Sequence, residues 1–310
     1  MEDDLHADVA PPPSGGLIRL QARAVDLGSW LGPMWAALCG VLASNAFNWQ
    51  DGDWVQVALL LLLVDAGWGT LWAALASTDW TLAFRRWRPP SVSSSGGEGV
   101  GDARNEPTVA LPYTLPGTPG DRISRWMGRM SSWWQRVLWP TCGAAVRAVF
   151  VALPLTALMA ALLGPELLLL SVAALGLMQL GVIWEGGRGV APSGWDALIA
   201  ITLPWLAGHV TFASATLPSV GLATLFGLAW GSAWRTTSRW VRAVLIASQL
   251  SSAAYLVVLH RPLAAGALSL FLVPQMALLP WVRRDLSTAR FARHTRVWLM
   301  AAMAVAALVL

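Results

Sequence analysis

The chain has 310 residues, of which 56% are hydrophobic and 12% charged, well below the roughly 25% charged residues of a soluble domain. The net charge is +4 and every one of the 21 basic residues is arginine. These arginines fall in short segments between apolar runs, which is the distribution that membrane topology produces, so a nucleic-acid-binding surface is excluded. Cys39 and Cys142 have no CxxC or Cys/His neighbours, which excludes a disulfide framework and a zinc site.

Residues 1–28 begin with an acidic, proline-rich stretch. They predict a disordered cytoplasmic tail and no signal peptide, because no basic segment precedes an apolar core. A membrane crossing needs about 20 apolar residues. Nine runs of roughly that length predict an all-α integral membrane domain over 29–310, with spans at 30–48, 54–77, 139–163, 165–184, 195–217, 218–234, 241–259, 262–282 and 295–310.

The placement of the arginines predicts the orientation of these spans. Cytoplasmic loops carry an excess of basic residues. With the N-terminus inside, nine spans put 20 of the 21 arginines on the cytoplasmic side and leave only Arg261 outside. We therefore expect a cytoplasmic N-terminus and an external C-terminus.

The longest loop, 85–138, ends in an amphipathic segment. Over 121–138, four arginines share one helical face, and Ile123, Trp126, Met130, Trp133 and Val137 share the other. This pattern predicts an interfacial helix. It acts either as a connector on the membrane surface or as a lid over a cytoplasmic cavity.

Two polar residues lie inside predicted spans. Asp65 is near the middle of the second span, where a charge is costly and marks either a functional group or a protonated, hydrogen-bonded one. His209 is in the middle of the fifth span. A neutral imidazole there is either a ligand for the Mg²⁺ of a chlorin pigment or a buried group bonded to a backbone carbonyl.

Three segments resemble the (bacterio)chlorophyll synthase branch of the UbiA-type prenyltransferases. "LGPMWAALCGVLAS" (31–44) is similar to its first span, which carries a PPMWAFxCG pattern. "SGWDALIAITLPWLAGHVTF" (193–212) is similar to its fifth span, and "LFLVPQMALLPWVRRDLSTARF" (270–291) to its eighth span and following loop. The resemblance implies a nine-helix bundle with a central cavity that opens to the cytoplasm of a bacterial inner membrane.

The same family carries NDxxDxxxD after the second span and a second acidic motif, roughly DFKSxEGD, after the sixth. Both hold Mg²⁺ ions that neutralise the leaving pyrophosphate of a prenyl diphosphate. On this resemblance, "STDWTLAF" places Asp79 at the first aspartate and "GDARNEP" places Asp102 at the last, followed by Asn105, while Glu98 stands for the middle acid. An insertion separates the two halves of the motif.

The second motif is missing. "AWGSAWRTTSRWVRA" (229–243) contains no acid, and Arg235 and Arg239 lie where carboxylates are expected. These guanidinium groups repel a divalent cation. They either bind the anionic head group of a ligand without metal or serve only as positive-inside residues.

The resemblance and the lost motif together predict a catalytically impaired relative that binds a chlorin pigment such as (bacterio)chlorophyll, or an isoprenoid chain, in contact with membrane lipid. Its predicted role is that of an accessory, assembly or structural subunit of the photosynthetic apparatus. The alternative is an active prenyltransferase that uses Mg²⁺ and esterifies (bacterio)chlorophyllide or a related acceptor. A transporter or an unrelated membrane scaffold is a third reading, which requires the family matches to be accidental.

Overall fold

The computed structural model describes residues 27–48, 51–76, 118–185, 197–233, 238–280 and 288–310, and these residues are helical with no strand. The N-terminal half contains α1 (Leu27–Ala43), α2 (Asp51–Leu62), the π-helical η1 (Leu63–Gly69), α3 (Thr70–Ala76), α5 (Pro119–Trp133), the π-helical η2 (Trp134–Leu138), α6 (Trp139–Leu163) and α7 (Pro165–Glu185). The C-terminal half contains the π-helical η3 (Leu198–Thr202), α9 (Leu203–Phe212), α10 (Leu217–Ala233), α11 (Arg239–Val258), α12 (Pro262–Leu278) and α13 (Thr288–Val309).

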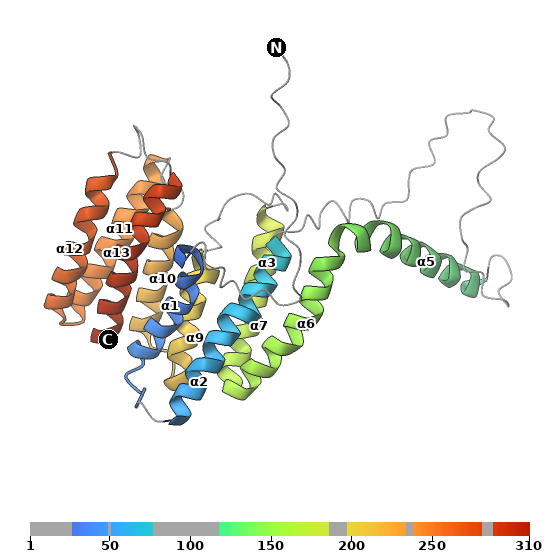
Figure 1. Cartoon of the computed structure of the whole chain (residues 1–310), viewed down its shortest axis with the longest axis horizontal. Helices are drawn as coiled ribbons and strands as arrows, with labels where there is room; N and C mark the ends of the chain where they lie inside the picture. Colours follow the sequence, from blue (N-terminus) through green and yellow to red (C-terminus); the bar gives the residue numbers. More distant parts are fainter. Residues whose placement is uncertain (1–26, 49–50, 77–117, 186–196, 234–237, 281–287) are drawn as a thin grey trace, which may run out of the picture.

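The helices form an antiparallel bundle in which α1 and α9 lie in the middle (Figure 1). One apolar core joins α1, α9 and η3 to α10–α13, and a second joins the same central helices to α2, η1, α3, α6 and α7. Because α1 and α9 contribute to both cores, their contact holds the two halves of the bundle together. At this contact Gly40 of α1 and Gly208 of α9 each face the backbone of the other helix directly.

Among the described residues, four helical stretches are long and apolar enough to cross a membrane: Gly52–Ala76, Trp126–Leu163, Pro165–Ile183 and Arg239–Val258. Shorter apolar helices cover Gly32–Ala43, Leu198–Phe212, Leu217–Ala233 and Pro262–Leu278. The all-helical prediction is therefore confirmed for the described residues, as are helices suited to a bilayer. Nine crossings stay a prediction.

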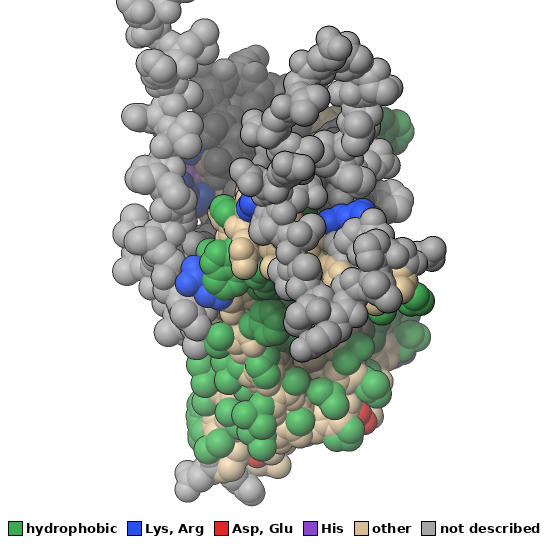
Figure 2. Space-filling model, turned by 90° about the vertical axis from the view of Figure 1, so that its right-hand side faces the viewer, with side chains coloured by type: hydrophobic (Ala, Val, Ile, Leu, Met, Phe, Trp, Pro, Cys, Tyr) green, Lys and Arg blue, Asp and Glu red, His purple; other side chains and the backbone are tan. Residues whose placement is uncertain are grey.

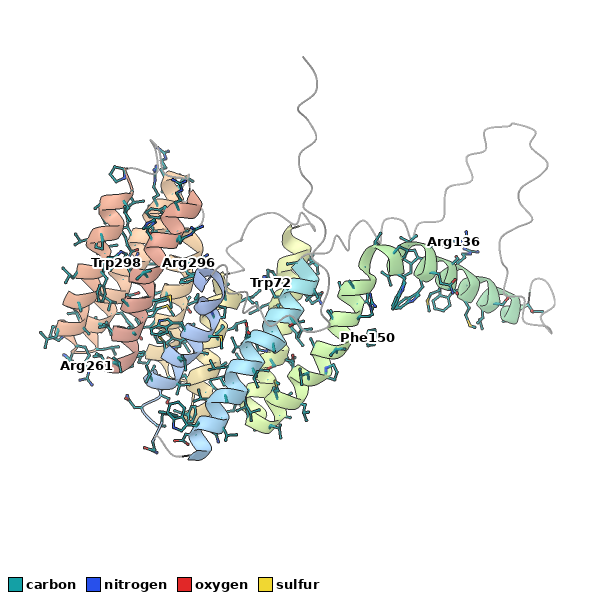
Figure 3. All side chains as sticks on the ribbon, in the orientation of Figure 1. Trp72, Arg136, Phe150, Arg261, Arg296 and Trp298 are labelled. Carbon is teal, nitrogen blue, oxygen red and sulfur yellow. The ribbon has the colours of Figure 1, made fainter. Side chains whose placement is uncertain are left out.

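The outer face of α6 and α7 is apolar and exposed. Phe150, Leu169 and Ile183 are each 72% exposed, and Phe150 points away from the bundle (Figure 3). Figure 2 shows hydrophobic side chains over the lower part of this side of the molecule and arginines above them. Such a surface is too large and too apolar for a water-facing helix pair, and it suits contact with lipid.

Several helix boundaries differ from the predicted ones, among them the end of α1 and the start of α13. α1 ends at Ala43, five residues before the predicted end of its span, because Asn45 adopts a left-handed backbone conformation (φ 53°) that stops the helix. α13 begins at Thr288 rather than at 295. Its first two turns carry arginines, which hydropathy assigns to a loop although the backbone is already helical.

α5 and α6 form one continuous helical stretch that bends at η2. α5 extends away from the bundle (Figure 1), and its apolar side chains Ile123, Trp126 and Met130 are 41–56% exposed. At the bend, the rings of Trp134 and Trp139 stack with centroids 6.3 Å apart, and the Arg147 guanidinium lies 5.6 Å from the Trp139 centroid. These contacts brace the junction between the two helices.

Candidate functional site

The bundle has two ends that differ in chemistry. At one end, α3, α7, α10 and α12 finish, and α6, α11 and α13 begin. We call it the Arg239 end because Arg239, Arg242 and Arg293 lie there. At the other end, α1, α9 and α11 finish, and α10 and α12 begin. We call it the Arg261 end, after the arginine between α11 and α12.

Most residues of the predicted diphosphate site lie outside the described residues. Asp79, Glu98, Asp102 and Asn105 belong to the 77–117 stretch, and Arg235 belongs to 234–237. Arg239 is described. It is the first residue of α11, it is exposed, and its guanidinium lies 5.6 Å from the centroid of the Trp240 ring. This contact places the charge at the surface of the bundle.

The described residues at the Arg239 end do not fit a Mg²⁺ site of the family's kind. α10 ends in Gly231, Ser232 and Ala233, and α11 begins with Arg239 after Ser238. Across the described ranges, no group of three or more His, Cys, Asp or Glu side chains lies together. A hard divalent cation needs several oxygen ligands, with carboxylates among them.

Asp65 lies in η1, where it is 8% exposed. Two residues further along η1, a Cβ on Gly67 would lie 2.8 Å from Thr156 Oγ1. The Trp68 Nε1, Thr156 Oγ1 and Ser171 Oγ atoms are buried, and none has a hydrogen-bond partner among the described residues. Asp65 is therefore a buried carboxyl group in the middle of the Gly52–Ala76 helical stretch, away from both ends of the bundle.

His209 lies in the last turn of α9, because the helix ends at Phe212 and Ala213 is extended. His209 therefore lies near the Arg261 end of the bundle and not in the middle of a span, as the sequence predicted. Its ring is 2% exposed. His209 Nε2 lies 3.2 Å from the Ser214 carbonyl oxygen and 3.5 Å from Thr216 Oγ1, and Nδ1 is buried without a partner among the described residues.

This geometry gives no support to a chlorin ligand at His209, and that role stays a prediction. An axial histidine needs one nitrogen open to a space that admits the macrocycle, whereas His209 Nε2 is engaged by Ser214 and Nδ1 is enclosed. The arrangement matches the second prediction for this residue, a buried histidine bonded to a backbone carbonyl.

A pocket of about 440 Å³ opens at the Arg261 end, beside His209. Its polar lining includes Ser44, Asn45, Ser214, Thr216 and Arg261. Figure 3 shows Arg261 at the lower end of the bundle, away from Arg296 and Trp298. The pocket therefore lies at the end opposite to the cavity that the sequence predicts.

A second pocket, of about 160 Å³, lies between α1 and α2 and has a wholly apolar lining: Trp35, Leu38, Cys39, Val41, Leu42, Phe47, Trp54 and Val57. The Phe47 ring stands edge-on to Trp54 and to Phe212, with centroids 5.3 and 5.6 Å apart. Its residue types suit a hydrocarbon chain, and its volume holds a segment of one.

Arg296 is a buried cation, although its sequence position places it among the arginines predicted to be cytoplasmic, at the start of the last predicted span. It is 7% exposed, and its guanidinium lies 5.4 Å from the centroid of the Trp230 ring of α10. The sequence contains one hint of this burial. Arg290, Arg293 and Arg296 recur every three residues, as residues on one side of a helix do. Which of them faces the bundle depends on where α13 begins, and the sequence does not give that position.

Comparisons with protein-family models, with curated proteins and with solved structures find no match for this chain.

Proposed function

We propose that this protein is a catalytically impaired relative of the UbiA-type prenyltransferases, of the (bacterio)chlorophyll synthase branch. In this proposal it binds an isoprenoid chain or a chlorin pigment and acts as an accessory or structural subunit of the photosynthetic apparatus. The observation that carries it is the sequence 229–243, which retains no acid and holds Arg235 and Arg239 where that branch has carboxylates. The three resembling segments support the choice of family by their order along the chain.

The chemistry explains why this change stops catalysis. Ionising a prenyl diphosphate requires positive charge on both sides of the leaving pyrophosphate, held by carboxylates from two connections. Without the second set of carboxylates, the protein can hold cations on at most one side of the pyrophosphate. Arginine side chains bind a phosphate bidentately, so binding of the anionic head group survives while its ionisation does not.

The apolar pocket between α1 and α2 supports the isoprenoid part of the proposal. It contains part of "LGPMWAALCGVLAS", the segment that resembles the family's first span. Trp35 contributes to the pocket, and its indole Nε1–H donates to the Met300 carbonyl at 2.9 Å. Because this bond ties the ring to α13, one wall of the pocket is held in place before a chain enters.

The proposal includes nine crossings of a bacterial inner membrane, a cytoplasmic N-terminus, an external C-terminus and a central cavity that opens at the Arg239 end. It is supported by the antiparallel alternation of the described helices and by the gathering of arginines at one end.

The alternative is an active prenyltransferase, favoured by the acids that the first motif retains in Asp79, Glu98 and Asp102. Membranes that contain the protein, supplied with geranylgeranyl diphosphate, chlorophyllide and Mg²⁺, separate the two. We expect no esterified product above membranes that lack the protein. Turnover that disappears in Asp79→Ala or Asp102→Ala establishes the active enzyme and refutes the impaired one.

Ligand identity is tested separately. Organic extraction of the purified protein, followed by mass spectrometry and an absorbance spectrum, reports any isoprenoid or chlorin. We expect Val57→Trp, which fills the apolar pocket, to lower the bound isoprenoid at least fivefold. Gly52→Ala on the same helix has open space around its added methyl group and is the matched control. A preparation without either class of ligand contradicts the proposal.

A further inference from the structure

The polar pocket at the Arg261 end has no role in the proposed function, which places its ligand head group at the Arg239 end. Six helix ends meet around it: Ala43 and Val309 end α1 and α13, Ala213 and Leu259 follow α9 and α11, Pro218 is in the first turn of α10, and Arg261 precedes α12. Several carbonyl groups at these ends already accept a backbone N–H, as the Gly40, His209 and Tyr255 carbonyls do from Ser44, Ala213 and Leu259, but a carbonyl oxygen can accept a second hydrogen bond. The pocket is therefore lined by groups that can take up hydrogen bonds.

Arg261 supplies the positive charge of the pocket. Its backbone is fixed in a tight turn: His260 adopts a left-handed conformation (φ 60°), and the Arg261 N–H donates to the Leu256 carbonyl at 2.8 Å. Pro262 then begins α12. The side chain is exposed, and its guanidinium forms no hydrogen bond or ion pair with the rest of the described chain. All five of its N–H donors remain for a ligand.

The opposite wall offers hydrogen-bond acceptors. The last carbonyl groups of α1, α9 and α11 lie close to the pocket, and a helix C-terminus carries partial negative charge. Thr216 is fixed as the cap of α10, because its Oγ1 accepts the Ser219 N–H at 3.4 Å. A ligand that carries both an anion and a hydrogen-bond donor matches these two walls.

Apolar side chains flank the same opening. Leu217 directly follows Thr216 and is 81% exposed, and Leu263 lies two residues after Arg261 and is 91% exposed. Both stand in the first turn of their helices, where the polar end of the bundle meets its apolar surface. A ligand with a polar head and hydrocarbon chains contacts both kinds of surface at once.

We propose that this pocket binds the phosphate head group of a membrane phospholipid. Arg261 holds the phosphate, an amine or hydroxyl of the head group donates to the carbonyl groups that end α1, α9 and α11, and the acyl chains run along Leu217 and Leu263. The shared chemistry is a phosphate group, which a free phosphate ion also carries, so the test separates these two sources.

The test uses the purified full-length protein in detergent, stripped of lipid. Its melting temperature is measured against increasing phosphatidylethanolamine, phosphatidylcholine or inorganic phosphate. We expect phosphatidylethanolamine to stabilise the protein with a saturable dependence. Phosphatidylcholine, whose ammonium group has no N–H donor, is expected to bind at least threefold more weakly, and inorganic phosphate to have no effect at the same concentrations.

Variants assign the effect to the pocket. Arg261→Gln is expected to weaken phosphatidylethanolamine binding about tenfold, as loss of a charge-assisted hydrogen bond does, and Arg261→Lys to weaken it less. Arg293→Gln removes the same charge from an exposed position at the Arg239 end and is expected to leave binding unchanged. Ala213→Leu narrows the pocket but keeps Arg261, so it also weakens binding. Melting temperatures without lipid show that each variant folds.

Three results overturn the proposal. If Arg261→Gln and Arg293→Gln weaken phosphatidylethanolamine binding equally, the binding depends on positive charge over the whole surface and not on the pocket. Stabilisation by inorganic phosphate as strong as that by phospholipid assigns the pocket to a free anion. Equal binding of phosphatidylethanolamine and phosphatidylcholine removes the role of the helix-end carbonyl groups.

Discussion

Gly40 and Gly208 are the residues on which the contact between α1 and α9 depends. A Cβ on Gly40 would collide with the Trp205 carbonyl oxygen and would lie 2.9 Å from the His209 backbone nitrogen. A Cβ on Gly208 would collide with the Ala37 carbonyl oxygen and would lie 2.9 Å from the Val41 nitrogen. The two backbones touch because neither helix carries a side chain at the crossing.

We expect Gly40→Ala and Gly208→Ala each to lower the free energy of unfolding by about 3 kcal/mol, the upper part of the range for overpacked sites. The obstacle is backbone on both sides, so no side chain can rotate away. Unfolding in mixed detergent micelles with increasing dodecyl sulfate measures the change. Gly266→Ala has nothing within 4 Å of the new methyl group and should stay within about 1 kcal/mol of the parent protein. Equal effects at all three positions would contradict this assignment.

α11 and α12 share one buried polar contact inside an otherwise apolar surface. Gln249 Nε2 donates to Gln275 Oε1 at 2.9 Å, and Gln275 Nε2 donates back to Gln249 Oε1 at 3.0 Å. The Phe271 carbonyl accepts a further bond from Gln275 at 3.0 Å. Both side chains are buried, so each amide satisfies the other and fixes the register of the two helices.

Substitution of either glutamine by leucine should cost about 1 to 2 kcal/mol, because the remaining amide loses its partner in an apolar setting. The double variant should cost less than the sum, with a coupling energy of about 1 kcal/mol, as measured for interhelical bonds in membranes. The same micelle titration measures the parent protein, the two single variants and the double variant, which together form a double-mutant cycle. Gln179→Leu, on the exposed face of α7, is the control. Additive losses would show that the pair is not coupled.

At the scale of the whole molecule, the antiparallel order of the helices separates the two ends chemically. Arg239, Arg242 and Arg293 lie at one end, and Arg261 lies at the other. Loops rich in arginine stay in the cytoplasm, so the Arg239 end is expected to face the cytoplasm and the pocket beside His209 to face outward.

A membrane-impermeant maleimide tests this orientation in intact cells. The two native cysteines, Cys39 and Cys142, are buried, so background labelling should be low. We expect Asn48→Cys, exposed at the Arg261 end, to label before lysis, and Ser238→Cys, exposed at the Arg239 end, to label at least fivefold more after lysis than before. Labelling in the reverse order would place the N-terminus outside.

The sequence by itself determined the helical class and the apolar character of the chain, because hydropathy and helical periodicity are local properties that each segment carries alone. It also located most helices within a few residues. α1 ends earlier than predicted because Asn45 adopts a left-handed backbone conformation, and α13 begins earlier because its arginine-rich first turns are helical. Hydropathy reports neither of these backbone conformations.

Only the tertiary structure decided which polar residues share a space. It moved His209 from mid-span to a helix end and joined it to Ser214, Thr216 and Arg261 in one pocket. It also buried Arg296 against Trp230. Arg261 is 52 residues from His209 along the chain, and Arg296 is 66 residues from Trp230. Their meeting depends on the crossing of α1 with α9 and on the pairing of α10 with α13, which no local pattern encodes.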